Sequence, residues 1–258
     1  MLFVMSPAKS LNFETKSNAQ TSSEPLFLSD SEKIMSVLKK KSVNKLMKMQ
    51  DISKNLGELN FLRNQNWNTE TKKASNKQAI SSFHGEVYVG LNESDFTEED
   101  YTFAQDHLRV LSGLYGILKP LDLIQPYRLE MGTQLKTTRG KNIYEFWKMR
   151  ITESLNNEFE KDEKPVLINL ASEEYFKSIK PKNLKADIIQ PVFMDKKNGK
   201  FKVISFFAKK ARGLMARFVI KNRIDSPEEL KAFDSEGYLY SEEMSVENKW
   251  VFLRDLEF

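Results

Sequence analysis

The dipeptide Asn198-Gly199, set between two runs of apolar residues, is the feature that most constrains the fold. Asparagine and glycine tolerate the positive φ angles that a two-residue hairpin turn requires, so Ile188–Met194 and Phe201–Phe206 are predicted to pair as antiparallel strands. A helical pattern over Ala208–Arg223 follows directly. A hairpin that leads straight into a helix does not fit the regular alternation of a doubly wound α/β sheet, and it favours an α+β fold.

The rest of the chain mixes helices and strands without a regular order. Three short helices are predicted between Ser29 and Arg63, and Thr97 with Asp100 forms a capping box for a helix that runs past Leu108. Further helices are predicted at 74–83, 143–159, 173–179 and 226–233, and strands or extended segments at 2–5, 87–89, 127–135, 166–170, 238–240 and 250–253. We expect a single compact domain over residues 1–258, with a mixed β-sheet core surrounded by helices.

The chain has 258 residues, no cysteine and two histidines, which limits its chemistry. Disulfides, thiolate nucleophiles and cysteine-ligated metal sites are excluded. His84 and His107 fit no metal-binding spacing, and no Walker loop or dinucleotide-binding glycine pattern occurs, so we expect no metal and no cofactor. The first residues do not resemble a signal peptide, and no run approaches the roughly 18 apolar residues of a membrane span. We expect a cytoplasmic protein.

Positive charge is concentrated in one segment. Between Asp195 and Asp225 the chain has no acid and ten basic residues: Lys196, Lys197, Lys200, Lys202, Lys209, Lys210, Arg212, Arg217, Lys221 and Arg223. The helix within this segment has an apolar stripe that we expect to pack on the core: Phe207, Ala211, Leu214, Met215 and Phe218. Lys210, Arg217 and Lys221 form a row about 16 Å long beside the stripe.

Two interpretations of this charge stay open from the residues alone. The first is the solvated face of an ordinary helix. The second is an anion-binding surface, because no glutamate precedes a lysine by four residues to form an ion pair within the helix, and because the preceding hairpin adds four more lysines.

A second basic candidate lies in residues 43–62, which resemble a degenerate helix-hairpin-helix DNA-binding element. Such an element contacts phosphates through the backbone of a glycine-containing hairpin and through flanking lysines. In this comparison Lys54 takes the phosphate-facing position, while Leu56 and Leu59 form the buried face of the second helix. Asp51 and Ser53 replace the expected glycines, so an ordinary helical turn is the alternative.

Polar residues that could support catalysis gather in two clusters and near Lys9. The first cluster is Gln125, Tyr127, Arg128 and Glu130, and the second is Asn169, Ser172, Glu173, Glu174 and Tyr175. The second cluster follows a predicted buried strand, and Lys9 follows another, so these groups could converge at one end of the sheet. A carboxylate beside an arginine or a lysine can act as a general base. A structural salt-bridge network, with Ser172 as a helix cap, is the alternative.

Several segments in collinear order resemble the YaaA peroxide stress protein family. They are SPAKSL (6–11), FHGEVYVGL (83–91), LSGLYGILKPLDLIQPYRLEMG (111–132), INLASEEYFKSIKP (168–181) and KNGKFKVISFFAKKARGLMARF (197–218). The resemblance implies a cytoplasmic bacterial protein that limits peroxide damage to DNA and is associated with low free iron. It also implies a single-domain α+β fold peculiar to the family, and DNA binding through a positively charged cleft and a helix-hairpin-helix element.

The leading hypothesis is therefore a protein that binds duplex or distorted DNA without sequence specificity. The residues expected to contact DNA are Lys9, Lys48, Lys54, Arg128, Lys177, Lys180, Lys209, Lys210, Arg212 and Arg217. The alternative is an enzyme that acts on a nucleobase, a nucleotide or a DNA lesion, with Glu130 or Glu174 as acid or base and Tyr127 as a stacking group. A third hypothesis, a stress-responsive protein-interaction module, has no motif behind it. Any effect on iron is expected to be indirect.

Overall fold

The computed structural model describes residues 1–71 and 76–255. Its helices are α1 (Leu28–Leu38), α2 (Val43–Gln50), α3 (Lys54–Asn66), α4 (Ala79–Ser82), α5 (Glu86–Leu91), α6 (Glu98–His107), α7 (Ile143–Trp147), α8 (Arg150–Glu158), α9 (Glu173–Phe176) and α10 (Ser205–Lys221). Short 3-10 helices lie at η1 (Glu93–Asp95), η2 (Pro181–Asn183), η3 (Pro227–Ala232) and η4 (Ser235–Gly237).

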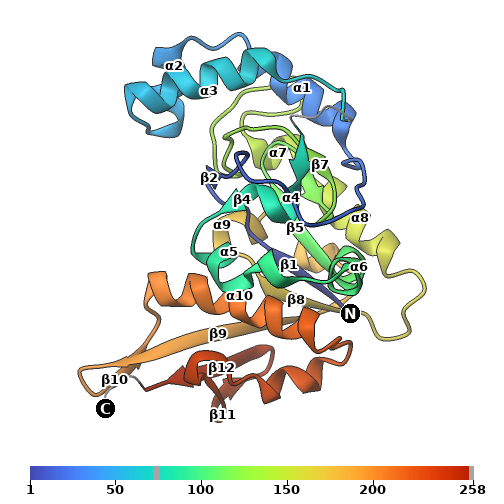
Figure 1. Cartoon of the computed structure of the whole chain (residues 1–258), viewed down its shortest axis with the longest axis vertical. Coiled ribbons are helices and arrows are strands. Elements are labelled where there is room, and N and C mark those ends of the chain that lie inside the picture. Colours follow the sequence, from blue (N-terminus) through green and yellow to red (C-terminus); the bar gives the residue numbers. More distant parts are fainter. Residues whose placement is uncertain (72–75, 256–258) are drawn as a thin grey trace.

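A mixed sheet forms the centre of the molecule (Figure 1). Its strands, in spatial order, are β11 (Leu239–Val246), β12 (Lys249–Arg254), β9 (Asp187–Lys197), β8 (Val166–Leu170), β1 (Leu2–Met5), β5 (Leu108–Ser112) and β6 (Gly116–Leu118), and β10 (Lys200–Lys202) pairs with β9. The pairs β1–β5, β1–β8, β8–β9 and β9–β12 are parallel, and the three hairpin pairs are antiparallel. Two small sheets join β2 (Ser10–Leu11) to β4 (Phe83–His84) and β3 (Lys77–Gln78) to β7 (Leu123–Ile124). The α+β prediction is confirmed.

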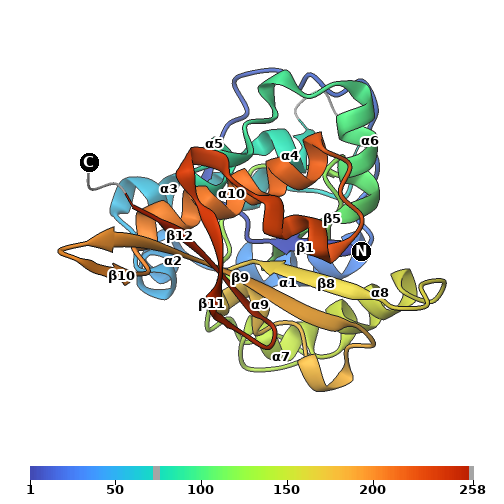
Figure 2. The same cartoon turned by 90° about the horizontal axis from the view of Figure 1, so that it is seen from below.

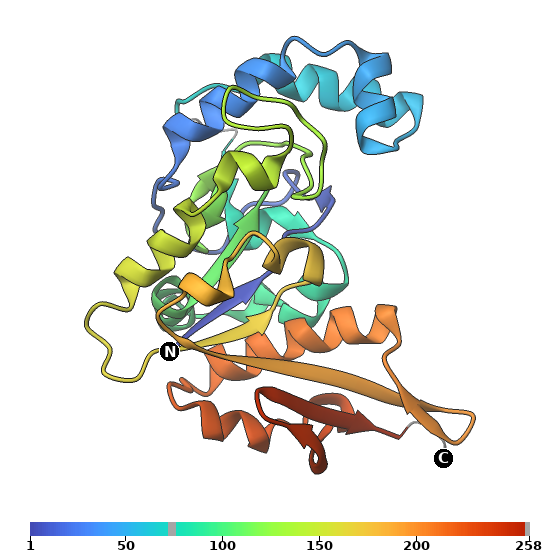
Figure 3. The same cartoon turned by 180° about the vertical axis from the view of Figure 1, so that it is seen from behind.

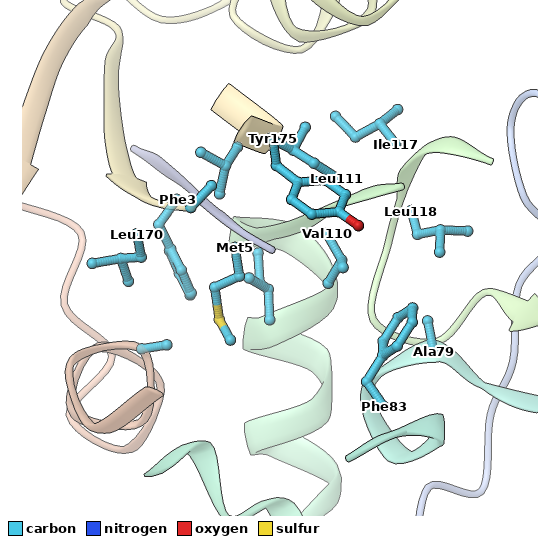
Figure 4. Close-up of a cluster of buried hydrophobic side chains, with 14 of the residues drawn as sticks. Phe3, Met5, Ala79, Phe83, Val110, Leu111, Ile117, Leu118, Leu170 and Tyr175 are labelled. Atoms are coloured by element: carbon cyan, nitrogen blue, oxygen red, sulfur yellow. The ribbon is translucent and has the colours of Figure 1, made fainter. Parts of the chain in front are cut away.

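The hydrophobic core is built around β1, all four residues of which are buried. Phe3 and Met5 of this strand lie among side chains of β5 and β8, including Val110, Leu111 and Leu170 (Figure 4). Seen from below, α5, α6 and α10 cover one face of the sheet, and α7, α8 and α9 cover the other (Figure 2). A strand buried on both faces has to be apolar throughout, which is why LFVM shows no alternation.

The local signals that predicted turns and helix starts are confirmed. Asn198 and Gly199 have φ angles of 56° and 70°, as the hairpin turn requires. Thr97 and Asp100 form the reciprocal bonds of a capping box. The three helices between Ser29 and Arg63 are α1, α2 and α3. The strands near 2–5 and 166–170 and the final hairpin are also present.

Other predictions were wrong where packing overrides local pattern. The predicted strand 87–89 lies in helix α5, which packs against α10. The helix from Thr97 ends at His107, and Leu108 to Ser112 form the buried strand β5, because a buried strand and a buried helix both appear as an apolar run. Helix 143–159 is broken at Lys148, whose φ of 47° is left-handed.

The remaining differences concern the ends and types of short elements. Strand β10 stops at Lys202, and α10 begins at Ser205, so the strand does not reach Phe206. Residues 127–135 form no strand, helix 173–179 ends at Phe176, and 227–232 is a 3-10 helix. Of the predicted helix 74–83, positions 74 and 75 lie outside the described residues, 77–78 are β3, and only 79–82 are helical.

Helices α5 and α10 approach each other closely at two glycines. A Cβ on Gly213 would lie 1.8 Å from the Val87 carbonyl oxygen and 2.7 Å from the Leu91 nitrogen. A Cβ on Gly90 would lie 2.2 Å from the Lys210 carbonyl oxygen. These contacts involve backbone atoms, so a larger side chain at either glycine forces the two helices apart.

The substitution Gly213→Ala therefore tests this contact. Alanine gains up to about 1 kcal/mol of helix propensity over glycine, but overpacking typically costs about 1–3 kcal/mol and more where backbone has to move. We expect the free energy of unfolding, measured in urea, to fall by about 2 kcal/mol or more. Gly85→Ala is the matched control, because its Cβ would meet Ala8 at an ordinary 3.4 Å. Equal stability of both variants would contradict the packing argument.

Candidate nucleic-acid interface

Basic segments from distant parts of the sequence lie on one side of the molecule. The α2–α3 hairpin projects at one end of this side and the β9–β10 hairpin at the other, with the turn after β1 between them (Figures 1 and 3). In the view turned by 90°, α2, α3 and β10 again lie on the same side (Figure 2).

Helix α10 is fixed to the core along a broader face than the sequence predicted. Ala211 and Met215 of the predicted stripe are buried, whereas Phe207, Leu214 and Phe218 are only partly buried. The buried face also includes Ala208, Gly213, Ala216, Val219 and Ile220. The helix is covered on two sides, by α5 and by strands β8 and β9, which sets the direction in which each cation points.

The row of cations that seemed best placed to follow phosphates is neutralised. Lys210 lies 2.5 Å from a carboxylate oxygen of Glu236, Arg217 binds Asp95 with two hydrogen bonds of 2.6 and 2.8 Å, and Lys221 lies 2.8 Å from Asp100. Arg223 also binds Asp100, at 2.7 Å. Residues 196–224 include no acid, but η1, α6 and η4 supply the carboxylates that pair with these cations.

A second set of cations lacks such partners. Within residues 1–71 and 76–255, no carboxylate lies within ion-pair distance of Lys197, Lys200, Lys202, Lys209 or Arg212. Arg212 is only partly exposed, and burial lowers the pKa of its guanidinium. A desolvated cation without a counter-charge is destabilising on its own and favours the binding of an anion.

We name the unneutralised cations and the residues between them the hairpin–helix corner, residues 197–212. It includes the end of β9, all of β10 and the first half of α10. Lys196 lies just outside it and is 2.6 Å from Asp255. Lys209 is fully exposed at the corner, whereas Arg212 is partly covered.

Lys9, Arg128 and Glu130 form one cluster at the end of β1. Glu130 Oε1 lies 3.0 Å from Arg128 Nη2 and 3.5 Å from Lys9 Nζ. Glu130 Oε2 is buried and has no hydrogen-bond partner among the described residues. A cavity of about 10 Å³, lined also by Tyr127 and Tyr175, lies beside this cluster, which is room for about one water molecule.

The α2–α3 hairpin is attached to this cluster. Gln50 of α2 donates a hydrogen bond of 2.8 Å to the Arg128 carbonyl oxygen. Arg63 of α3 is partly buried, and this burial together with the charge of Arg128 lowers the pKa of Arg63. Two guanidinium groups are thus held near each other, and only that of Arg128 forms an ion pair with Glu130. Sequence patterns did not single out Arg63, because nothing in the sequence shows that it lies near Arg128.

The turn of this hairpin departs from a glycine hairpin in the way the sequence indicated. Asp51 adopts the left-handed conformation, with φ of 50°, and Ser53 caps α3 by accepting a bond from the Leu56 nitrogen. The prediction that Leu56 and Leu59 form the buried face was wrong, because both are exposed. The buried face of α3 consists of Gly57, Asn60 and Asn64 instead.

The remaining basic candidates are exposed or lie in local ion pairs. Lys48 is exposed beside Lys45 and Gln134, and Lys54 lies 3.9 Å from Glu58. Lys177 forms an ion pair of 2.9 Å with Glu173, and Lys180 donates to the Lys177 carbonyl oxygen. Glu58 and Glu173 are well exposed, so these helical pairs contribute little and leave the lysines available.

The acid and aromatic candidates of the enzyme hypothesis are held by other groups. Glu174 accepts a 3.0 Å hydrogen bond from the Gly132 nitrogen. The Tyr127 hydroxyl bonds Ser112 at 2.7 Å, and burial raises its pKa. Its ring is buried, so no base can stack on it. Ser172 stands at the start of α9 but bonds Ser6 and not the helix.

Within residues 1–71 and 76–255, no three His, Asp or Glu side chains are grouped so that they could hold a metal ion. No helix there is long and apolar enough to span a membrane.

The pairing of Asp100 with the end of α10 predicts a pH dependence. Burial raises the pKa of Asp100, but hydrogen bonds from Lys221, the Thr97 backbone and Arg223 lower it more, to about 2. The folded pKa is below the unfolded value of 3.8, so this stabilisation is complete above about pH 4 and is lost as the pH falls towards 2. It amounts to about 2 kcal/mol.

We therefore expect Asp100→Asn to be less stable than the parent at pH 7, and the difference to shrink between pH 4 and 2. Urea unfolding at several pH values measures this. Asp106→Asn on the same helix is the control, because Asp106 is exposed and its carboxylate has no hydrogen bond or ion pair among the described residues. A constant difference across this pH range would show that Asp100 is not held in its charged form.

The comparison with known protein families agrees with the motifs. The family model described as "Peroxide stress protein YaaA" matches residues 1–244, which include the α2–α3 hairpin, the Lys9 cluster and the whole hairpin–helix corner. The match confirms the resemblance that the sequence segments carried. Because it covers almost the whole length, the chain belongs to the peroxide stress protein YaaA family.

Proposed function

We propose that this protein binds DNA through the phosphate backbone and, in the peroxide stress response, protects the DNA from oxidative damage. The observation that carries the proposal is the hairpin–helix corner, where five cations stand without an acid among the described residues while the rest of α10 is neutralised. Such a field attracts a polyanion and is not balanced within the folded chain. DNA in a bacterial cytoplasm is the polyanion that fits the family's role in peroxide stress.

The geometry supports contact with phosphates more than contact with base edges. Lysines on a strand hairpin and on the first turns of a helix can follow a backbone, and phosphate contacts carry no sequence information. Helices α2 and α3, which contain Lys48 and Lys54, and the turn after β1, which contains Lys9, lie on the same side of the fold (Figure 1). We propose that these lysines extend the surface. Lys177 and Lys180 follow α9 and could add to it. Arg217 and Lys210 contribute less, because each has its own acid.

Arg63 and Arg128 strengthen the proposal at the upper end. Arg128 and Lys9 share one carboxylate, Glu130. The charge of Arg128 also acts on Arg63, for which no carboxylate lies within ion-pair distance among the described residues. Excess positive charge there stabilises an approaching phosphate. The association with lower free iron belongs to this proposal as an indirect effect of protecting DNA and is not assigned to particular residues.

Salt dependence tests the proposal. The affinity for a short labelled duplex, measured by fluorescence anisotropy, should fall with salt with a log–log slope of about 0.9 per phosphate neutralised. In the variant Lys209→Ala/Arg212→Ala the slope should decrease by about 1.8, because two contacts are lost. The sequence of the duplex should have little effect on either protein.

The control variant is Lys161→Ala/Lys164→Ala. These exposed lysines lie in the segment between α8 and β8, on the opposite side of the molecule (Figure 1). The control removes the same net charge and should keep the parent slope. Binding that does not respond to salt, or an equal loss in both variants, would leave the corner without a role in binding DNA.

One observation favours the enzyme as a second candidate. Glu130 Oε2 is buried, has no hydrogen-bond partner among the described residues, and lies beside a small cavity next to Lys9 and Arg128. An acceptor of this kind could take a proton from a group held by the two cations. An oligonucleotide that carries an oxidised base, incubated with the parent and with Glu130→Gln, would show base release or strand cleavage only with the parent. If neither protein gives a product, the enzyme hypothesis fails and DNA binding remains as the proposed function.

A further inference from the structure

The hairpin–helix corner also exposes large apolar side chains. Phe201 on β10, Val203 just after it and Phe206 in the first turn of α10 are 37%, 53% and 55% exposed. Phenylalanine and valine side chains left partly in solvent forgo part of the stabilisation that burial would give, and here three of them lie within six residues. Grouped exposed apolar residues of this kind mark a binding surface.

The cations and the apolar groups of β10 are arranged by the strand's alternation. Lys200 pairs with Lys197, and Phe201 pairs with Lys196. Side chains of paired residues lie on the same face and neighbours point to opposite faces, so Lys197, Lys200 and Lys202 share one face with Asp195, and Phe201 lies on the other. Beyond β9, no strand pairs with β10 in the described part of the chain, so its outer edge is open.

At the start of α10, unlike on β10, an exposed ring and a cation lie side by side. Phe206 and Lys209 are three residues apart, so they are neighbours on the helix surface. The Phe206 ring is held edge-to-face by Phe207, with ring centroids 5.8 Å apart, and Phe207 is in turn covered by the Arg254 guanidinium at 4.9 Å. The exposed ring therefore has a fixed support behind it and a cation beside it.

We propose that the hairpin–helix corner binds unpaired nucleobases, so that the protein prefers single-stranded or locally opened DNA over intact duplex. Phe201 and Phe206 stack on bases, and Lys209 contacts the phosphate beside the Phe206 ring. Lys197, Lys200 and Lys202 contact phosphates where the strand passes to the opposite face of β10. This inference rests on the proposed DNA binding and adds to it the chemical form of the ligand. Aromatic rings beside a basic groove are the usual platform for a single strand, because every base has a face that can stack.

The charge and burial at the corner favour a nucleic acid over other occupants. A second copy of this chain would place two strongly positive surfaces together. An anionic bilayer attracts exposed lysines, but a flat surface does not reach the partly buried Arg212. A flexible strand with phosphates reaches both the exposed lysines and the recessed arginine.

The experiment compares three labelled oligonucleotides by fluorescence anisotropy: a mixed-sequence single strand, the same strand with abasic sites in place of most bases, and a duplex. The test variant is Phe201→Ala/Phe206→Ala. Stacking contributes a factor of about 5–100 per base, so we expect the variant to lose about tenfold or more in affinity for the single strand. Its affinity for the abasic strand and the duplex should stay within about twofold, since phosphate contacts are unchanged.

The control variant is Leu239→Ala/Val246→Ala. These two residues are 63% and 65% exposed on β11 of the same sheet, away from the corner. A second readout uses Phe206→Trp, because the three native tryptophans are buried and an exposed new one should be quenched when a base stacks on it. We expect quenching with the single strand and none with the abasic strand.

The outcomes distinguish a failure of the stacking proposal from a failure of the proposed DNA binding. Equal affinity of the parent for normal and abasic strands, or an unchanged affinity of the double alanine variant, would overturn the stacking proposal while leaving phosphate binding in place. No salt-dependent binding of any oligonucleotide would overturn the proposed function as well. Stronger binding to vesicles of anionic lipid than to DNA, or self-association lost in the double variant, would also overturn this inference.

Discussion

The contact between α5 and α10 determines how the basic surface is presented. Gly90 and Gly213 allow backbone atoms of the two helices to approach to distances that no other side chain permits. Helix α10 is then held between α5 on one side and strands β8 and β9 on the other, and cannot rotate about its axis. The rotation of α10 about its axis decides which of its cations meet acids and which face solvent. The distribution of unpaired positive charge on the surface is therefore set by packing in the interior.

Neutralisation along α10 changes from one end to the other. At the C-terminal end, Asp100 receives both Lys221 and Arg223 and also bonds the Thr97 backbone, so a single buried carboxylate caps one helix and fixes the end of another. At the N-terminal end, Lys210 pairs with Glu236, but Lys209 and Arg212 have no such acid among the described residues. A chain that needed only a soluble helix would gain from pairing these cations too. Their lack of partners has a cost in self-repulsion that binding an anion relieves.

Local structure could be predicted from the sequence, whereas the ion-pair partners of residues distant in the chain could not. The turn at Asn198-Gly199, the capping box at Thr97 and the buried strand at Leu2–Met5 each depend on residues within a few positions. The acids that neutralise Arg217 and Lys221 are more than 100 residues away in the chain, and no periodicity points to them. Leu56 and Leu59 show the same limit, because helical spacing shows that they share a face and cannot show which face is covered.

The candidate site could be predicted in part for the same reason. Lys9 follows a predicted strand, and the sequence suggested that Arg128 and Glu130 could converge with it at one end of the sheet. The three side chains do lie together. Arg63 was not expected, because it reaches Arg128 only through the docking of the α2–α3 hairpin by Gln50. That docking has a consequence for binding. It holds a second guanidinium close to that of Arg128, and the burial of Arg63 weakens the screening of these two like charges by solvent. An anion that binds there would satisfy Arg63 and Arg128 together and would hold the helical hairpin in place.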